Sequence, residues 1–110
     1  YLGMARNEAT LQPECYLEKL PPRLGRYEVM ICDPMLATGG SAVAAGQLLQ
    51  QRGARHLHFL HALDAPEGVR ALRKVFPNEA VYLGAVDERL NEHGYIHPGL
   101  GDAGDRCFGA

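Results

Sequence analysis

The stretch Tyr27-Glu-Val-Met-Ile-Cys-Asp-Pro-Met-Leu-Ala-Thr-Gly-Gly-Ser41 decides the fold of this chain. Its short apolar run at residues 29–32 contains β-branched residues, which predicts a buried strand that ends at Asp33. Pro34 cannot donate to a sheet ladder, and the Gly39-Gly40 pair allows positive φ and a close approach of the backbone to a ligand. We therefore expect a loop between Asp33 and the glycine pair.

A helix is expected to follow this loop, over residues 41–52, because most side chains there are good helix formers. Gly53 is well placed to end it. A strand that leads through a glycine-rich loop into a helix N-terminus aims backbone N–H groups and a positive dipole at one point. Such a turn is more often a plain packing turn than a phosphate site, but the hydroxyls of Thr38 and Ser41 can supplement the backbone donors.

The rest of the chain predicts an α/β protein. The apolar runs at residues 56–63 and 80–86 are expected to be further buried strands. Between them, Pro66 suits the first position of a helix, and apolar residues recur at helical spacing as far as Val75 or Phe76. Strand, helix, strand, helix, strand with short links predicts a parallel sheet whose ligands lie beyond the carboxyl ends of its strands. Asp33, Asp64 and Asp87 are expected at that rim.

Composition narrows the class of protein. The 110 residues are enough for at most one domain, and the net charge of -2 favours neither nucleic acid nor an anionic membrane as partner. The three cysteines show no paired spacing, and Cys32 falls in a predicted buried strand, so we expect a reducing cytoplasm and no zinc site. No apolar run is long enough to span a bilayer. The start at Tyr1, without methionine, fits a fragment.

Two motifs resemble one known family. Asp33-Pro-Met-Leu-Ala-Thr-Gly-Gly-Ser41 is similar to the phosphoribosyl-pyrophosphate loop of phosphoribosyltransferases, which usually have two adjacent acids before Ala-Thr-Gly-Gly; proline as the second is characteristic of uracil phosphoribosyltransferases. Leu90-Asn-Glu-His-Gly-Tyr-Ile-His-Pro-Gly-Leu-Gly-Asp-Ala-Gly-Asp-Arg106, followed by Phe108-Gly109, resembles the uracil-binding segment of that family. Because the family's chain is considerably longer, the resemblance implies the C-terminal half of a type I phosphoribosyltransferase-like fold.

The resemblance divides the chain into a β-arm (residues 1–26), a βαβαβ core (27–86) and a uracil-binding loop region (87–110). It implies a binding site for the phosphoribosyl donor made by Arg6, Asp33, Pro34, Met35, Leu36, Ala37, Thr38, Gly39, Gly40, Ser41 and Asp102. It implies that uracil is bound by Tyr95, Ile96, Gly101, Asp102 and Ala103. Asp33 and Asp102 are the implied catalytic residues, although a carboxylate at Asp33 could also serve only as a turn residue.

The implied reaction converts uracil and 5-phosphoribosyl 1-diphosphate to uridine monophosphate and diphosphate, in pyrimidine salvage. Since Pro34 removes the second carboxylate, Mg²⁺ is expected to be held mainly by the oxygens of the donor, with no dedicated metal ligands. His97 stands where the family more often has an aliphatic residue, so it either changes the polarity of the pocket or points to solvent. The histidines at positions 56, 58 and 61 are expected to be strand residues.

Two alternatives stay open at this stage. A pyrimidine-sensing regulator of the same fold would bind RNA, but its basic stripe is not evident here, because the basic residues are scattered. A transferase for another nucleobase is the second alternative, and Pro34 and the Gly-Tyr-Ile segment argue against it. Relatives also imply a homo-oligomer (dimer or tetramer) and, in some cases, GTP as an activator.

Overall fold

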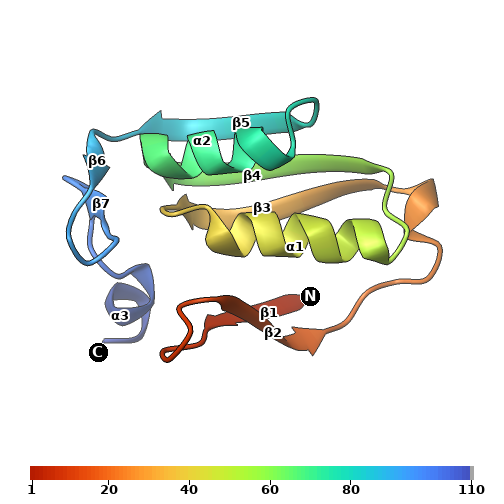
Figure 1. Ribbon diagram of the computed structural model, residues 1–110, viewed down its shortest axis with the longest axis horizontal. Helices are drawn as coiled ribbons and strands as arrows, with labels where there is room; N and C mark the ends of the chain where they lie inside the picture. The colour runs from red at the N-terminus through yellow and green to blue at the C-terminus, as the bar shows by residue number, and fades with distance from the viewer. Residues whose placement is uncertain (110) are drawn as a thin grey trace.

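The core of the molecule is a parallel three-stranded sheet in the order β3-β4-β5. The structure is a computed structural model that describes residues 1–109; Ala110, the end of the predicted uracil-binding region, lies outside the described residues. The core elements in chain order are β3 (Glu28–Leu36), α1 (Gly40–Gln51), β4 (His56–Asp64), α2 (Pro66–Val75) and β5 (Ala80–Val86). Both helices cover the same face of the sheet (Figure 1). The predicted βαβαβ core is confirmed.

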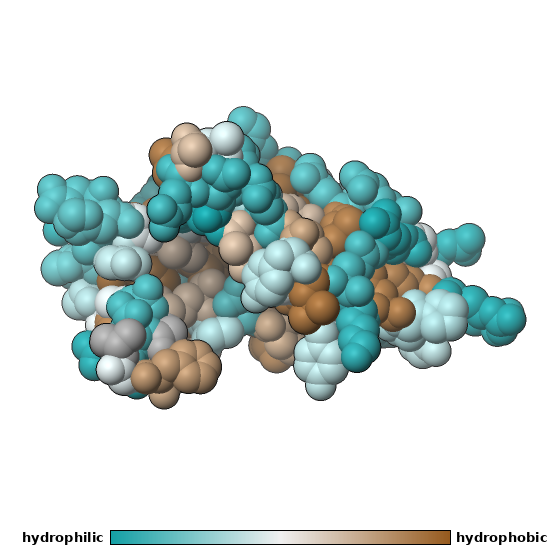
Figure 2. Space-filling model, turned by 90° about the horizontal axis from the view of Figure 1, so that it is seen from below, coloured by the Kyte–Doolittle hydropathy of each residue, from teal (hydrophilic) through white to brown (hydrophobic). Residues whose placement is uncertain are grey.

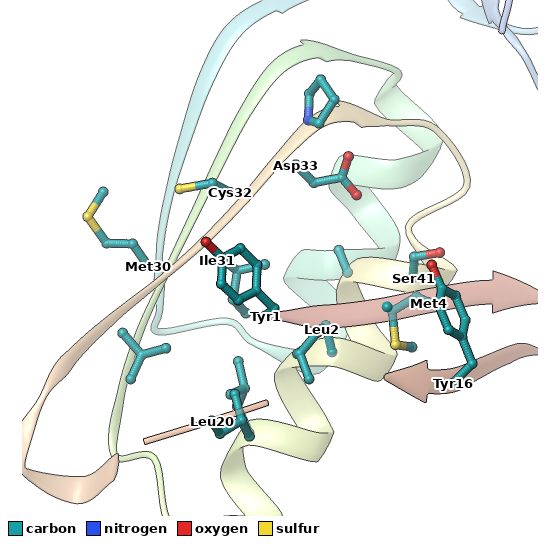
Figure 3. A pocket seen from close by; sticks show the side chains of 16 residues that line it. Tyr1, Leu2, Met4, Tyr16, Leu20, Met30, Ile31, Cys32, Asp33 and Ser41 are labelled. Carbon is teal, nitrogen blue, oxygen red and sulfur yellow. The ribbon is translucent and has the colours of Figure 1, made fainter. Parts of the chain in front are cut away.

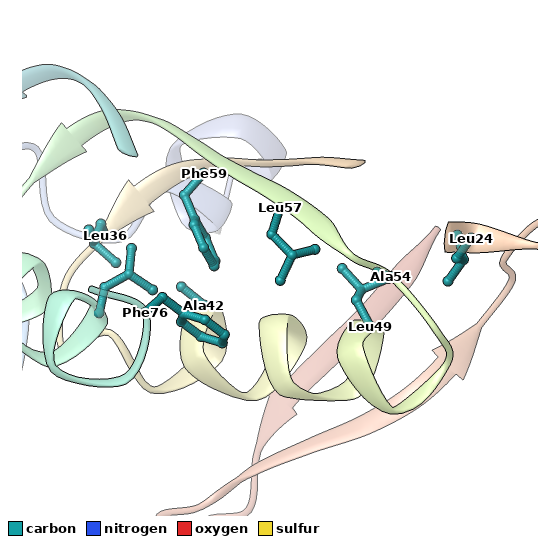
Figure 4. Close-up of a cluster of buried hydrophobic side chains, with 9 residues drawn as sticks. Leu24, Leu36, Ala42, Leu49, Ala54, Leu57, Phe59 and Phe76 are labelled. Carbon is teal, nitrogen blue, oxygen red and sulfur yellow. The ribbon is translucent and has the colours of Figure 1, made fainter. Parts of the chain in front are cut away.

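The hydrophobic core lies between this face and the two helices. Phe59 is fully buried in the middle of β4, and its ring lies 5.2 Å from that of Phe76, the residue that ends α2 (Figure 4). Burying one such side chain stabilises the fold by about 1.5–3 kcal/mol. Of the two residues expected to close the apolar face of this helix, Phe76 is buried whereas Val75 is exposed.

The opposite face of the sheet is uncovered within residues 1–109. Side chains alternate along β3, so that Met30 (56% exposed) and Cys32 point to the open face, together with Tyr82 (53% exposed) from β5. The prediction of a buried strand that includes Cys32 is therefore wrong for the residues on this face. The pattern reflects a sheet with one layer of helices, because each strand can bury only every second side chain.

β3 does not end at Asp33, as the sequence suggested, but continues to Leu36. The register pairs Asp33 with His61 and Leu36 with Asp64. β3 pairs with β4 alone among the described strands, so Pro34 lies on an edge strand. An edge strand tolerates a proline whose missing N–H would face away from its partner. The phosphate-loop motif thus begins inside the strand, and the loop proper is residues 37–39.

Helix α1 begins one residue earlier than predicted and ends as expected at a glycine. Gly53 has φ of +99°, and its N–H donates to the carbonyl of Gln50. The next N–H, that of Ala54, donates to the carbonyl of Leu49. These two bonds form a Schellman motif, which satisfies carbonyls that the end of a helix leaves unpaired. β4 then begins at His56, after a short turn.

The predicted β-arm is an antiparallel hairpin of β1 (Leu2–Arg6) and β2 (Pro13–Glu18). It lies beside α1 (Figure 1), and Arg52 at the end of that helix forms a two-pronged ion pair with Glu18, at 2.5 and 3.0 Å. A short 3-10 helix, η1 (Leu24–Arg26), then leads into β3. Arg6, at the end of β1, comes close to the phosphate loop as a result.

The segment after β5 folds across the carboxyl ends of the strands (Figure 1). The resemblance implied a loop region here. The segment contains a small antiparallel pair of strands and one short helix: β6 (Arg89–Leu90), β7 (Ile96–His97) and α3 (Ala103–Phe108). His97 is exposed, which favours the interpretation that it points to solvent. Among residues 1–109, no helix has the length and hydrophobicity that crossing a membrane requires.

Candidate functional site

The phosphate loop passes directly from β3 into the first turn of α1. Gly39 precedes the helix with φ of +88°, a conformation that costs a non-glycine residue roughly 1–2 kcal/mol. The side-chain oxygen of Thr38 accepts a hydrogen bond of 3.3 Å from the N–H of Gly40. The N-cap residue, Gly39, has no side chain that could accept from the other N–H groups of this turn. The remaining backbone donors of the first turn of α1 therefore face the loop, as an anion site requires.

The loop is supported from behind by the start of α2. The N–H of Ala65 donates to the carbonyl of Leu36 at 2.9 Å. Gly68, in the first turn of α2, lies so close to the loop that an added Cβ would be 2.5 Å from the carbonyl oxygen of Ala37. An added Cβ on Gly39 would in turn lie 3.0 Å from the carbonyl oxygen of Gly68. Two glycines thus allow the helix and the loop to pack backbone against backbone.

A cavity of about 120 Å³ lies in front of the loop. It gathers residues from three predicted parts of the donor site: the end of the arm, the carboxyl end of β3 and the phosphate loop. The residues around it are Arg6, Asp33, Met35, Leu36, Ala37, Thr38, Gly39, Ser41 and Ala42. Eight of these nine are residues that the family resemblance implied for the donor site; Ala42 is the ninth and was not among them. Its size is that of a small anion rather than of a whole nucleotide.

Asp33 lies on the helix side of β3 and faces the same space as Ser41 (Figure 3). One carboxylate oxygen accepts a bond of 3.2 Å from the N–H of Met35, so the residue also has the turn role considered from the sequence. The carbonyl of Asp33 accepts a bond of 3.0 Å from Nδ1 of His61 on the neighbouring strand. Asp33 is thus fixed through its backbone, and its second carboxylate oxygen has no such bond in the described residues.

A second, larger cavity of about 570 Å³ runs along the free edge of β3, between that strand, β1 and α1 (Figure 3). Most of the side chains around it are apolar or aromatic, including Leu2, Met4, Tyr16 and Ile31. Asp33 and Ser41 stand at its end. One end of this cavity therefore lies next to the phosphate loop, along the edge of the sheet that β3 forms.

The predicted uracil-binding residues lie at the same end of the molecule as the phosphate loop (Figure 1). The C-terminal segment approaches the phosphate loop at Gly94, where an added Cβ would lie 3.9 Å from Cγ2 of Thr38. Figure 2 shows a hollow between the C-terminal segment, on the left, and the body of the molecule. Of the predicted residues, Tyr95 is 42% exposed whereas Ile96 is 2% exposed. None of them lies on the wall of the small cavity.

Asp102 acts as the N-cap of α3. One of its carboxylate oxygens accepts a bond of 2.9 Å from the N–H of Asp105, and its carbonyl accepts from the N–H of Arg106. A capping aspartate of this kind typically stabilises a helix by about 1 kcal/mol. This role was not predicted from the sequence. The cap fixes the backbone of Asp102 at the start of α3, and with it the backbone of its two neighbours, Gly101 and Ala103.

Asp64 is not at the ligand rim, where the sequence placed it. Its side chain is fully buried, and both carboxylate oxygens are without a hydrogen-bond partner in the described part of the chain. Burial raises the pKa of the Asp64 carboxyl, although the nearby imidazole of His61 acts in the opposite direction. His61 is buried as well, with Nε2 unpaired among these residues. No sequence pattern signalled this pair, because each residue sits in an apolar run.

The site combines a parallel α/β core, a helix N-terminus behind a glycine turn, a carboxylate on the strand before it and an arginine nearby. This combination is typical of a class of proteins, those that bind a sugar phosphate or a nucleotide. The comparisons with known proteins narrow this class. A family model described as uracil phosphoribosyltransferase matches residues 1–110. The chain belongs to the uracil phosphoribosyltransferase family.

Individual relatives agree with this membership. Uracil phosphoribosyltransferase of Streptococcus pneumoniae R6 is 54% identical over 109 residues, which are 99% of this chain and 52% of the relative. That of Roseiflexus castenholzii is 55% identical over the same share of each chain. A solved structure, the AQ2163 protein from Aquifex aeolicus, superposes with a TM-score of 0.83 at 41% identity, covering 97% of this chain and 51% of that one. The chain spans about half the length of the curated relatives it matches.

Proposed function

We propose that the full-length protein transfers the phosphoribosyl group of 5-phosphoribosyl 1-diphosphate to uracil, giving uridine monophosphate and diphosphate in pyrimidine salvage. The observation that carries the proposal is the small cavity that combines Arg6, Asp33 and the phosphate loop. Family membership supports uracil as the base. The approach of Gly94 to Thr38 supports a single site in which the donor and the base meet.

In the proposed reaction the residues of this chain mainly bind and orient. The backbone N–H groups of the loop and the start of α1 hold the 5′-phosphate, and Asp33 accepts hydrogen bonds from the ribose hydroxyls through the carboxylate oxygen that Met35 leaves free. Arg6 offers a guanidinium to the diphosphate oxygens. As diphosphate leaves, positive charge develops at the ribose carbon, so the site must position the base and stabilise charge rather than supply a nucleophile.

We propose that the base is read by backbone groups of Ile96, Gly101 and Ala103, with Tyr95 beside it and Asp102 toward the donor. The burial of Ile96 supports this role for its backbone, because a hydrogen bond discriminates best where water is excluded. Asp102 contributes a second effect through its cap, since it fixes the turn that carries Gly101 and Ala103. An apolar pocket with few placed polar groups is the usual form of such a site.

Mg²⁺ is the proposed cofactor, held mainly by the oxygens of the donor. The donor set of the chain fits this arrangement: Asp33 is the carboxylate on the wall of the small cavity, and one of its oxygens is occupied by Met35. When bound, Mg²⁺ neutralises charge on the leaving diphosphate. Within residues 1–109, no group of three or more Asp, Glu, His or Cys side chains is arranged to hold a metal.

Three further features are proposed on the family resemblance: a homo-oligomer (dimer or tetramer), activation by GTP, and a cytoplasmic location. Light scattering of the purified protein tests the first, and a GTP titration of the initial rate tests the second. All three cysteines are free, which supports a reducing compartment.

The test of the proposed function is the formation of uridine monophosphate by the full-length protein with uracil, Mg²⁺ and the donor. If uracil is the base that the site accepts, an excess of adenine, guanine or cytosine is expected to reduce the formation of uridine monophosphate only slightly. The variant Asp33→Asn is expected to lose most of its activity. Glu28→Gln, on the same strand but at its opposite end, is the matched control and keeps wild-type activity. A folded wild-type protein that forms no product would refute the proposal.

A further inference from the structure

The carboxylate of Asp87 has a specific partner that lies outside the donor site. Asp87 follows β5 directly, and its own N–H donates to the carbonyl of Asp64 at 2.8 Å, which fixes its backbone at the end of the sheet. Its side chain then reaches across the segment that follows. The second carboxylate oxygen, Oδ2, accepts a bond of 3.0 Å from the N–H of Gly99. A rigid strand end therefore holds a loop residue twelve positions further along the chain.

Gly99 in turn touches the backbone of Ile96. An added Cβ on Gly99, which has φ of +43°, would lie 2.1 Å from the carbonyl oxygen of Ile96 and 2.8 Å from its carbonyl carbon. The two backbones are therefore in direct contact, and a shift of Gly99 moves the carbonyl of Ile96. Ile96 itself is almost fully buried, so its surroundings leave little room for independent adjustment.

The other strand of the small hairpin is anchored as well. Ile96 pairs with Leu90, whose N–H donates to a carboxylate oxygen of Glu67 in the first turn of α2. The same turn of α2 supports the phosphate loop through Gly68. The backbone at Ile96 is thus held from two sides, by Glu67 through Leu90 and by Asp87 through Gly99. The bond from Gly99 to Asp87 is the one nearer to Gly101, which follows two residues later in the chain.

We propose that Asp87 is a positioning residue for the pyrimidine: it does not touch the base, but its hydrogen bond to Gly99 sets the backbone at Ile96 and Gly101 that reads it. The inference rests on the proposed function. It predicts a specific kinetic effect, because Asp87 supports the base-binding segment and not the phosphate loop. Loss of its carboxylate weakens the binding of uracil and leaves the binding of the donor intact.

The experiment measures steady-state kinetics of the full-length protein for uracil and for the donor. Removal of a charged hydrogen-bond acceptor in Asp87→Ala raises the KM for uracil roughly 10-fold, with the KM for the donor unchanged. Asp87→Asn retains an oxygen that can accept from Gly99 and restores a uracil KM near that of the wild type. Glu92→Ala, at an exposed position of the same segment, is the matched control and behaves as wild type.

Asp87→Glu serves as a second variant if Asp87→Ala does not fold, since it keeps the charge but moves the carboxylate by one methylene. Amide hydrogen exchange gives a readout that does not depend on activity: exchange at Gly99 is faster in Asp87→Ala and Asp87→Glu than in wild type and Asp87→Asn. A folded variant with wild-type uracil KM and wild-type exchange at Gly99 overturns the inference. A wild-type protein without activity refutes the proposed function, and with it the inference.

Discussion

Gly68→Ala tests whether the start of α2 supports the phosphate loop. The added methyl would lie 2.5 Å from the carbonyl oxygen of Ala37, whereas a carbon and an oxygen normally approach to about 3.3 Å. The loop or the helix must therefore move by roughly 0.8 Å, the difference between these two distances. A displacement of about 1 Å in a binding site can reduce catalysis by up to roughly 100-fold. We expect kcat/KM for the donor to fall by about 10-fold to 100-fold.

Stability should respond less than activity. Overpacking of this kind costs about 1–3 kcal/mol, but replacing a helical glycine by alanine returns roughly 0.5–1 kcal/mol. The net loss, measured by urea unfolding of the full-length protein, is therefore expected to be about 0–2.5 kcal/mol. The uracil KM should change less than the donor KM, because Gly68 contacts the phosphate loop directly.

Gly46→Ala is the matched control. Gly46 lies in α1, and its added methyl would lie 2.7 Å from the ring of Phe76, in the hydrophobic core and away from the phosphate loop. This variant should lose a comparable amount of stability and retain the kcat/KM of the wild type for the donor. The reasoning is refuted if Gly68→Ala keeps wild-type kcat/KM, or if the two variants lose the same activity, since activity would then follow stability alone.

Three other outcomes follow from the structure. Because burial raises the pKa of Asp64, its contribution to stability is present at acidic pH and is lost as the pH rises through its folded-state pKa. Asp64→Ala should therefore gain stability over wild type by about 1–3 kcal/mol in neutral buffer and less in acidic buffer, and a difference that does not depend on pH would contradict this. Arg6→Ala should raise the KM for the donor roughly 10-fold in initial-rate assays without affecting that for uracil; an equal rise in both would argue against a contact with diphosphate. A chelator should abolish product formation, reversibly on addition of Mg²⁺, without lowering the melting temperature of the donor-free protein; a lower temperature would indicate a protein-held metal.

The βαβαβ core could be predicted from sequence because its signals are local. The glycine turn, Pro66 and Gly53 mark where helices begin and end, and the apolar runs of β4 and β5 mark the strands. The residues of the proposed donor site were carried over from the family resemblance, and most of them could be found together on one cavity because they are nearly contiguous in the sequence.

Other features depended on contacts that no local pattern records. Pro34 indicated the end of a strand, but an edge strand accepts proline, and whether β3 is an edge is decided by the tertiary fold. Cys32 was expected to be buried because an apolar run does not reveal how many faces of the sheet are covered. The bonds of Asp87 to Gly99 and of Asp102 to Asp105 could not be foreseen, because they require the geometry of the C-terminal segment.

The central claim is that the phosphate loop and the segment around Ile96 form two halves of one nucleotide site. A crystal structure of the full-length protein with uridine monophosphate tests it most directly. We predict the phosphate on the backbone N–H groups of residues 37–41 and the pyrimidine edge on the backbone of Ile96 and Gly101. A nucleotide whose phosphate lies elsewhere, or whose base makes no contact with the segment from Tyr95 to Ala103, would contradict the claim.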